Sequence, residues 1–480
     1  MRRFYLLSST LVLALGCGKD DDSKNKAECH LAAINLSTCQ RSTLAQVQRA
    51  GVWNLNVEFN DGTGTASALR LSGDTGPLMF NMPVTDQEST EESLYLASES
   101  VDAYNRKVRF ALAGCEGTAP TKMRGAFRRC VDGEMDLEGT FTAIRVTRRE
   151  GEAEASGLEL VKEVAMPRGS GVELAVAGGY AYVPTGKEGL FVFDVRNPAE
   201  AKKVGEFKPS DDVYTDVAVH GSLLYVASQK NGLVIYNIEN PASPKFLRSL
   251  AQPAVVLESL SVEGNHLVAG SPSPNGEVLV FELTTPAEPK LLDRYFVEGA
   301  EASLNEVPRD VKVVGDRLYA SMWTFGLTVS DFKKPADPKL LGRFSSVPSR
   351  AMAVGNVGGR MLAFSGGEDW GSYLSVLDVV NPASILQVGE FRLRPEVSIR
   401  SMTLSGSKLY VAFYQDGLRV LDVSNPGDVR QVAYYNSWRE TDANRGTTFF
   451  EGLNNVVVPG DGYIYAMESS RGLLIFRETP

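Results

Sequence analysis

The sequence predicts an all-β protein in two parts, a small β domain followed by a longer region of repeated four-stranded units. Two observations predict this class: short apolar runs alternate with polar residues along most of the 480-residue chain, and after residue 155 one short pattern returns seven times. Hydrophobic residues make up 43% of the chain and charged residues 22%, which is typical of folded soluble domains. The net charge of −10 argues against a nucleic-acid-binding protein, which normally carries a basic excess.

The N-terminus has the layout of an export signal. Two arginines precede an apolar run, Phe4 to Gly16, which is too short to cross a bilayer of about 30 Å as a helix. The run ends in LALGC at Cys17, which resembles a bacterial lipobox except that Ala14 stands three residues before the cysteine, where leucine is expected. The resemblance implies cleavage before Cys17 and lipid on that cysteine. We therefore predict a signal peptide over residues 1–16 and a membrane attachment through the lipid anchor only, with an ordinary signal peptide and an incidental cysteine as the alternative.

After the lipidated cysteine, residues 17–44 are predicted to form a polar tether that is part of no domain. Four further cysteines remain, at Cys29, Cys39, Cys115 and Cys130. An even number in an exported chain favours disulfides over metal or redox chemistry, and no CxxC spacing occurs. Of the three possible connectivities we expect the nearest neighbours to pair, Cys29 with Cys39 and Cys115 with Cys130. Free buried thiols are the alternative.

Residues 45–150 are predicted to form the small β domain. Alternating runs broken by Gly, Asp and Asn turns indicate half-buried antiparallel strands, among them 52–59, 93–101, 107–114 and 139–146. They would close into a small barrel or sandwich. Gly51 and Trp53, with Arg145 on the last strand, resemble the GxW signature of lipocalin-like barrels, which implies a ligand-carrying barrel. The alternative is that the tryptophan only fills the core.

Seven repeats follow. Their most regular copies read GLFVFDVRNP from Gly189, GLVIYNIENP from Gly232 and GLRVLDVSNP from Gly417. Each copy closes on a proline, at Pro198, Pro241, Pro286, Pro335, Pro382, Pro426 and Pro480. The spacings of 43 to 54 residues fit a four-stranded propeller blade and exceed the periods of ankyrin, tetratricopeptide and leucine-rich repeats. The region therefore predicts a seven-bladed β-propeller over residues 156–480.

The register at the two ends predicts how the ring closes. The last repeat stops after its third strand, at Pro480, and lacks a fourth. Residues 158–165 match the fourth strands that begin at Lys202 and Leu386. We expect this N-terminal strand to complete the seventh blade, because an open blade would expose an unpaired strand edge.

The repeat motif GLxVxDVxNPxxP, preceded by VxVxGxxxYV, resembles the LVIVD-repeat family of exported bacterial and archaeal proteins. Asp194, Asp331, Asp378 and Asp422 occupy the family's aspartate position, whereas Asn237, Glu282 and Arg477 depart from it. The resemblance implies a β-propeller in the bacterial cell envelope and no defined reaction. With the lipobox, it places the protein at the outer membrane or cell surface rather than at the inner membrane.

No motif for catalysis, metal or cofactor binding is present. The chain has three histidines: His30 lies beside the tether, and His220 and His266 have no cysteine or carboxylate at ligand spacing. HExxH, P-loop, GxSxG, GxGxxG and EF-hand patterns are absent from the sequence. We expect no catalytic residues, no metal and no cofactor.

A partner is expected on the propeller face that carries the loops between second and third strands. Aromatic residues and arginines, which are enriched at binding hot spots, gather in the segments of that face in blades four to seven. The predicted partner-binding residues are Trp323, Phe325, Trp370, Tyr414, Trp438, Arg350 and Arg400. The alternative is that the tryptophans pack between blades and the charges pair with one another.

The sequence thus favours a lipid-anchored envelope protein whose propeller binds a protein or glycan partner, without nucleic acid and without catalysis. One alternative is a hydrolase or lyase acting on a polysaccharide or lactone. It would use the carboxylates at the start of the inner strands of blades one to four, Glu173, Asp216, Glu258 and Asp310. The other alternative is a structural envelope scaffold.

Overall fold

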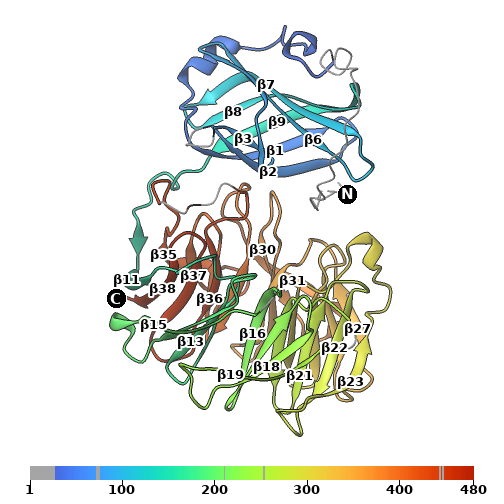
Figure 1. Ribbon diagram of the computed structural model, residues 1–480, viewed down its shortest axis with the longest axis vertical. Coiled ribbons are helices and arrows are strands. Elements are labelled where there is room, and N and C mark those ends of the chain that lie inside the picture. Colours follow the sequence, from blue (N-terminus) through green and yellow to red (C-terminus); the bar gives the residue numbers. More distant parts are fainter. Residues whose placement is uncertain are drawn as a thin grey trace. The chain divides into compact units, whose positions relative to one another are not determined.

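The computed structural model describes residues 28–71, 76–209, 211–251, 254–442, 445 and 448–479. Cys17 and the predicted signal peptide lie outside these residues. The chain divides into two compact units, residues 1–147 with 447–450, and residues 148–446 with 451–480. Figure 1 shows that both units are built almost entirely of strands, as predicted. Among the described residues, no helix is long and apolar enough to span a membrane.

The first unit contains one nine-stranded antiparallel sheet, in the order β4-β3-β2-β1-β9-β8-β7-β6-β5. The strands are β1 (Val52–Phe59), β2 (Gly64–Arg70), β3 (Leu78–Met79), β4 (Met82–Pro83), β5 (Asp86–Thr90), β6 (Ser93–Val101), β7 (Lys107–Ala119), β8 (Lys122–Val131) and β9 (Glu134–Arg145). The sheet curls until β3 and β4 contact β6, which makes a half-barrel. Its inner face is filled by apolar side chains, including fully buried Trp53, Leu55 and Val57. Trp53 lies opposite Arg145 and donates its indole N–H to the Arg49 carbonyl at 2.8 Å, so it fills the core of the unit.

The four cysteines of this unit that lie in the described residues are all paired, but the expected nearest-neighbour connectivity is wrong. Cys29 is bonded to Cys130 and Cys39 to Cys115. Cys115 and Cys130 cannot meet because they lie toward opposite ends of the β7–β8 hairpin: Cys130 faces Arg109, six residues along β7 from Cys115. Six strand residues span about 20 Å, far beyond the reach of a disulfide.

The segment before residue 45, predicted as tether, is folded from residue 28 onward. It forms the short 3-10 helices η1 (Leu31–Ala33) and η2 (Arg41–Gln46), and both of its cysteines are bonded to the sheet. Leu44 is buried beside Gly114, where an added Cβ would lie 3.3 Å from its methyl carbon. The polar composition of the segment concealed this, because two disulfides and the scattered buried side chains of Ile34 and Leu44 hold it in place rather than a periodic apolar face.

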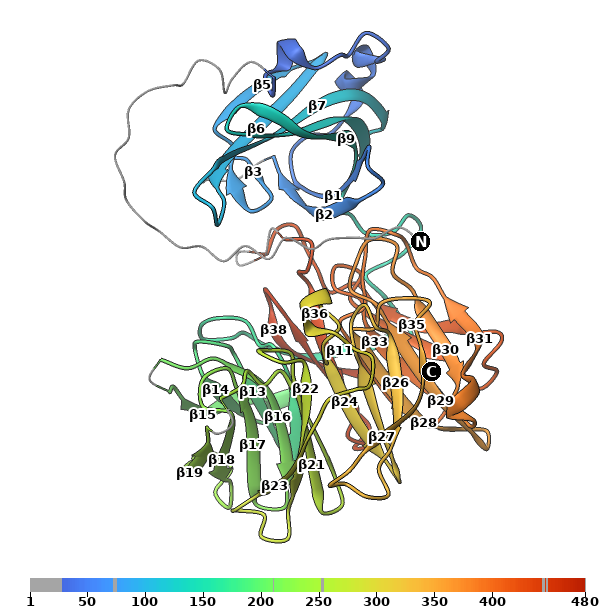
Figure 2. The ribbon, with the colours of Figure 1, turned by 90° about the vertical axis from the view of Figure 1, so that its right-hand side faces the viewer.

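The second unit is the predicted seven-bladed propeller, in which six blades are four-stranded antiparallel sheets and blade six has a short fifth strand (Figure 2). Blades one to five are β12 to β15 (Ala175–Ala177, Tyr180–Pro184, Leu190–Asp194, Lys202–Phe207), β16 to β19 (Tyr214–His220, Leu223–Ser228, Leu233–Asn237, Lys245–Leu250), β20 to β23 (Ser259–Glu263, His266–Ser271, Glu277–Glu282, Lys290–Tyr295), β24 to β27 (Asp310–Val314, Arg317–Ser321, Leu327–Asp331, Lys339–Phe344) and β28 to β31 (Ala351–Val357, Arg360–Gly366, Leu374–Asp378, Leu386–Phe391). Blade six holds β32 (Ser401–Ser405), β33 (Lys408–Ala412), β34 (Leu418–Asp422) and β35 (Arg430–Tyr435), and blade seven holds β36 (Leu453–Val457), β37 (Ile464–Glu468) and β38 (Gly472–Glu478). Three short helices lie in the links, η3 (Pro198–Glu200), η4 (Ala302–Leu304) and η5 (Pro382–Ser384).

The repeated Gly and Pro positions set the distance between blades. The Pro382 carbonyl at the end of blade five's third strand approaches Gly342 in the fourth strand of blade four, where a Cβ would lie 1.9 Å from it. Pro426 and Gly389 repeat this contact one blade later, at 1.8 Å. Only glycine allows so close an approach of two backbones, which explains why glycine sits inside these fourth strands.

The predicted closure is confirmed. Strand β11 (Leu158–Val164) pairs antiparallel with β38 and becomes the fourth strand of blade seven, beside the C-terminus in Figure 1. Arg471, which is 3% exposed, reaches across this pairing to the Glu163 carboxylate at 2.6 Å. The ring is thus closed by the chain's own N-terminal strand, without an open seam.

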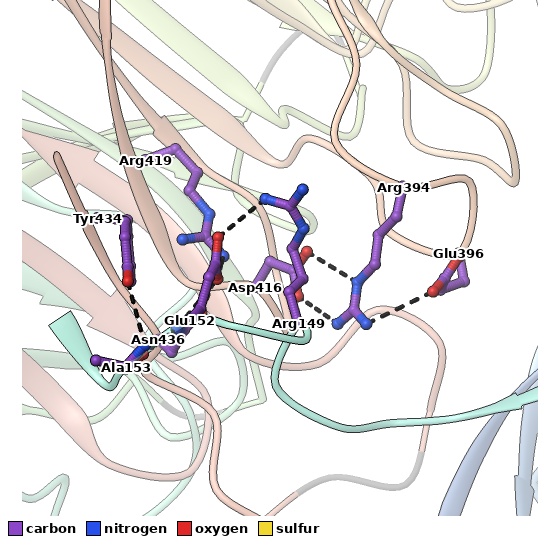
Figure 3. Close-up of polar contacts among 9 residues, drawn as sticks. All are labelled: Arg149, Glu152, Ala153, Arg394, Glu396, Asp416, Arg419, Tyr434 and Asn436. Carbon is purple, nitrogen blue, oxygen red and sulfur yellow. Dashed lines mark hydrogen bonds and ion pairs between the residues drawn. The ribbon is translucent and has the colours of Figure 1, made fainter. Parts of the chain in front are cut away.

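A second attachment lies just before β11. Strand β10 (Ala155–Ser156) adds to β35 as a fifth strand of blade six, and the residues before it continue along the same blade. Figure 3 shows Glu152 between Arg149 and Arg419, with Ala153 donating its backbone N–H to the Tyr434 hydroxyl. The Arg419 side chain is fully buried and donates to Glu152 at 3.0 Å. The sequence pattern did not predict this strap, residues 149–156.

Candidate binding site at the propeller axis

In six of the seven blades, a charged residue or asparagine lies at one or both of two equivalent positions near the start of the inner strand. Counted back from the glycine of the first turn, the sixth residue is Glu258, Arg309 or Arg400 in blades three, four and six. The fifth residue is Glu173, Asp216, Asp310 or Asn455 in blades one, two, four and seven. Inner strands of successive blades contact each other around the axis, so these positions form a ring.

Two carboxylates of the ring connect neighbouring blades. Asp216 accepts the backbone N–H of Leu260 in the next inner strand at 2.6 Å, and Asp310 accepts that of Met352 at 3.0 Å. An inner strand has a ladder partner on one side only, so its free N–H groups need acceptors, and these side chains supply them. This role accounts for Asp216 and Asp310 without any catalytic step.

Burial perturbs the acidic side of the ring. Burial raises the pKa of Glu173 to about 7, where the nearby Arg400 opposes the shift and Asp310 adds to it. Burial, together with the charge of Glu173, also raises the pKa of Asp216. The Glu173 carboxylate accepts a short hydrogen bond from the Asn455 amide, and that amide lies 3.3 Å from the Ser401 hydroxyl. Carboxyls that share a low-dielectric region ionise reluctantly, and this ring is such a region.

The basic side of the ring is largely paired. Arg309 binds both oxygens of Glu258, at 3.1 and 3.0 Å. Arg350 pairs with Glu368 at 3.2 Å and donates to the Arg309 carbonyl at 3.0 Å. An outside carboxylate would have to displace Glu368 before it could bind Arg350 with both oxygens.

Two aromatic residues flank these arginines in a backbone conformation that normally requires glycine. The turn after the second strand has the same hydrogen bonds in blades one, four and six, and its equivalent residues are Gly186, Trp323 and Tyr414. Their φ angles are 61°, 46° and 36°. In each blade this residue's carbonyl accepts an N–H from the segment entering the next inner strand, at 2.8 to 3.1 Å. A bulky side chain in the left-handed region costs about 1–2 kcal/mol, so these two aromatics are held there at the expense of stability.

The structure brings together most of the predicted partner-binding residues. Trp323 lies under the Arg309 guanidinium at 5.6 Å, and the Tyr414 hydroxyl donates a short hydrogen bond to Glu368, the partner of Arg350. Glu368 and Tyr414 also raise the pKa of Arg400, although burial opposes the shift. Phe325 is different, since it is buried in the core between blades three and four with Arg343 over its ring.

The remaining two predicted residues, Trp370 and Trp438, differ from Trp323 and Tyr414 in burial. Trp370 and Trp438 are partly exposed, whereas Trp323 and Tyr414 are buried at 7% and 4% exposure. Trp370 follows Asp369, whose pKa burial raises to about 6. Sequence reasoning missed Glu368 and Asn455. Alignment of the repeats on their first-turn glycines places Asn455 level with Glu173, whereas Glu368 lies in a loop that no repeat position marks.

A surface hollow of about 370 Å³ lies on the same face, between blades one and two. It is lined by Lys187, Lys208, Pro209, Asp211, Asp212, Val213, Gln229 and Lys230. Two of its lysines are already paired, Lys208 with Glu188 at 2.8 Å and Lys230 with Asp211. Across the part of the chain that the structure describes, no group of three or more His, Cys, Asp or Glu side chains could hold a metal ion.

Three segments of the chain match the LVIVD repeat, residues 168–208, 214–251 and 398–436. They correspond to blades one, two and six. No curated protein matches the chain in sequence. Among solved structures, the fold is similar to a chain of the mitotic checkpoint complex, with TM-score 0.52 and 13% identity over 70% of this chain and 96% of that one. It is also similar to the WD40 β-propeller domain of Doa1, with TM-score 0.50 and 12% identity over 68% and 98% of the two chains. These likenesses show the propeller fold.

Proposed function

We propose that the chain is a lipid-anchored protein of the bacterial cell envelope, at the outer membrane or cell surface, whose propeller binds a protein or glycan partner. The binding face carries the turns between second and third strands in blades four to seven. A propeller with LVIVD repeats is compatible with a binding or scaffold role.

The observation that carries the binding role is the left-handed conformation of Trp323 and Tyr414. Blade one forms the same turn with Gly186 and no strain, so the fold itself does not require an aromatic residue there. Strain of this kind collects at functional sites, where the side chain's position matters more than its conformational cost. Both residues, moreover, contact the ring through Arg309 and Glu368.

The anchor rests on the sequence before residue 18, and the two disulfides of the first unit support export because such bonds persist in oxidising compartments. Cys17→Ser should abolish fatty-acid labelling of the protein in cells and release it from the membrane fraction. Labelling that persists in this variant would contradict the anchor.

The binding face is tested with its partly exposed tryptophans. Full-chain protein on a sensor surface would be exposed to solubilised envelope fractions of the bacterium that encodes it, and Trp370→Ala and Trp438→Ala would be compared with the wild type. Each should weaken binding by about 2 kcal/mol, as at a hot spot, while its melting temperature changes little. Leu386→Ala is the matched control, because Leu386 is 59% exposed on the fourth strand of blade five, away from these turns.

Variants that lose stability but keep full affinity would show that the tryptophans serve blade packing. The hydrolase alternative loses support here, since Asp216 and Asp310 are engaged with backbone N–H groups and Glu258 with Arg309.

A further inference from the structure

Arg400 differs from the other arginines of the ring. It is partly buried at the start of blade six, and within the described residues its guanidinium makes no hydrogen bond or ion pair. Arg309 and Arg350, whose backbone N–H groups bond the last residue of the second strand in blades four and five as that of Arg400 does in blade six, are both bound to carboxylates. A guanidinium has five N–H donors, so Arg400 holds an unused donor set at the axis.

The groups around Arg400 are close enough to act on its charge but are engaged elsewhere. Tyr414, Glu368, Glu173 and Glu258 are the neighbours that raise its pKa against the effect of burial. Glu173 accepts from Asn455, Glu258 from Arg309, and Glu368 from Arg350 and Tyr414. Each of these carboxylates has further lone pairs that could accept from a ligand.

Asn455 adds an independent observation. Its side chain is 2% exposed, and its amide nitrogen lies between Glu173 and Ser401. Its amide oxygen is buried and finds no hydrogen-bond partner among the residues that the structure describes. Because an unpaired buried polar atom is costly, this oxygen points to a missing donor at the same place.

The charges of the ring decide which kind of ligand fits. Glu173, Asp216, Glu258, Asp310 and Glu368 face Arg309, Arg350, Arg400 and Lys312, which gives five carboxyls against four basic groups. The set is neutral once one carboxyl holds a proton. An anion would give the neutral set a net negative charge, and a cation would be repelled by the arginines. An uncharged ligand that both donates and accepts hydrogen bonds suits the mixture of free donors and free acceptors.

We propose that the ring of Glu173, Glu258, Arg400 and Asn455 binds an uncharged, hydroxyl-rich group, such as the end of a neutral glycan. Each sugar hydroxyl can accept from Arg400 and donate to a carboxylate or to the Asn455 oxygen. The inference rests on the proposed function, since it names the ligand class of the same face. It also makes Arg400 the residue that contacts the ligand, with Arg350 holding Glu368 in place.

The test uses the full chain and isothermal titration calorimetry with maltohexaose, cellohexaose and chitohexaose as neutral probes and hexagalacturonate as the acidic probe. At least one neutral hexaose should bind, and hexagalacturonate should bind no more tightly. Arg400→Gln should weaken that binding about tenfold or more, because charged hydrogen bonds to the ligand are lost. Arg400→Lys should be intermediate, since it keeps the charge but not the planar donor set.

Arg248→Gln is the matched control, because Arg248 pairs with Glu288 on the exposed fourth strand of blade two and should bind as the wild type does. If Arg400→Gln does not fold, Glu173→Gln replaces it and should also weaken binding, because one of the two carboxyl oxygens becomes an amide nitrogen that cannot accept a hydrogen bond. Failure of every neutral hexaose to bind, or an unchanged affinity in the folded variants, would overturn the inference. Hexagalacturonate binding that depends on Trp370 or Trp438 would overturn the ligand class and leave the proposed binding face intact.

Discussion

The two units of this chain fasten their N-terminal segments by different means. In the first unit, disulfides tie residues 29 and 39 to strands β8 and β7, across sequence separations of 101 and 76 residues. In the propeller, strand β11 and the strap are held by backbone hydrogen bonds and by ion pairs to Arg471 and Arg419. The first unit therefore depends on the redox state of its surroundings, whereas the propeller depends on having the full length of chain after residue 147.

The largest expected effect comes from removing the N-terminal strand that completes blade seven. A propeller beginning at Gly169 loses β11 and leaves Arg471 and Arg419 without Glu163 and Glu152. Because removing one partner of a buried ion pair costs about 3–5 kcal/mol, and an open blade edge is added, this chain should aggregate or fail to unfold cooperatively. One beginning at Arg148 keeps β11, the strap and the ion pairs of Arg471 and Arg419, and it should show a single cooperative urea transition.

A propeller beginning at Gly157 sharpens the comparison, because it keeps β11 but loses the strap. It should fold, with a free energy of unfolding about 3 kcal/mol below that of the chain from Arg148, since buried Arg419 loses Glu152 and the more exposed Arg439 loses Glu154. Equal stability of the chains from Arg148 and Gly169 would show that the N-terminal strand does not hold the ring.

Breaking the disulfides should affect the first unit only. The chain-entropy estimate for loops of 101 and 76 residues is about 4–5 kcal/mol each, so Cys39→Ser with Cys115→Ser should lower that unit's free energy of unfolding by about this amount. Differential scanning calorimetry should show one transition moving to lower temperature and the propeller transition unchanged. Reduction of the wild type should move the same transition, and a shift in both would contradict the independence of the two units.

The smallest expected effect concerns pH and the propeller alone. Burial raises the pKa of Glu468, which is fully buried in blade seven, to about 7 against an ordinary value of 4.5. The folded state thus binds this proton more tightly than the unfolded state, so its contribution is most favourable below pH 4.5 and is lost as pH rises to 7.

Between pH 4.5 and pH 8 the wild-type propeller should lose on the order of 3 kcal/mol of unfolding free energy through this group. Glu468→Gln should not show this loss. The amide oxygen can still accept from the N–H groups of Ser470 and Arg471. Urea unfolding at the two pH values measures the difference, and parallel stability of variant and wild type at both would refute the raised pKa.

Sequence alone determined the architecture of the propeller and its closure. Apolar alternation is a local property that each blade repeats, and a proline follows the third strand in all seven repeats. A missing fourth strand at Pro480 and a matching strand at residues 158–165 then leave one way to complete the ring, which β11 and β38 follow. The closure of the ring could therefore be predicted by counting strands, because the units share the same local pattern.

Only the tertiary structure shows the contacts between residues that are far apart in the chain and belong to no repeated sequence pattern. Cys29 and Cys39 find their partners through the curl and register of the first sheet, and Glu152 finds Arg419 across 267 residues. At the axis, the sequence marked Arg350 and Arg400 equally as candidate binding residues. Only the fold shows that Glu368 engages Arg350, whereas the Arg400 guanidinium has no hydrogen-bond or ion-pair partner among the residues that the structure describes. Ion pairing depends on distances of a few ångströms, which spacing along a sequence does not encode.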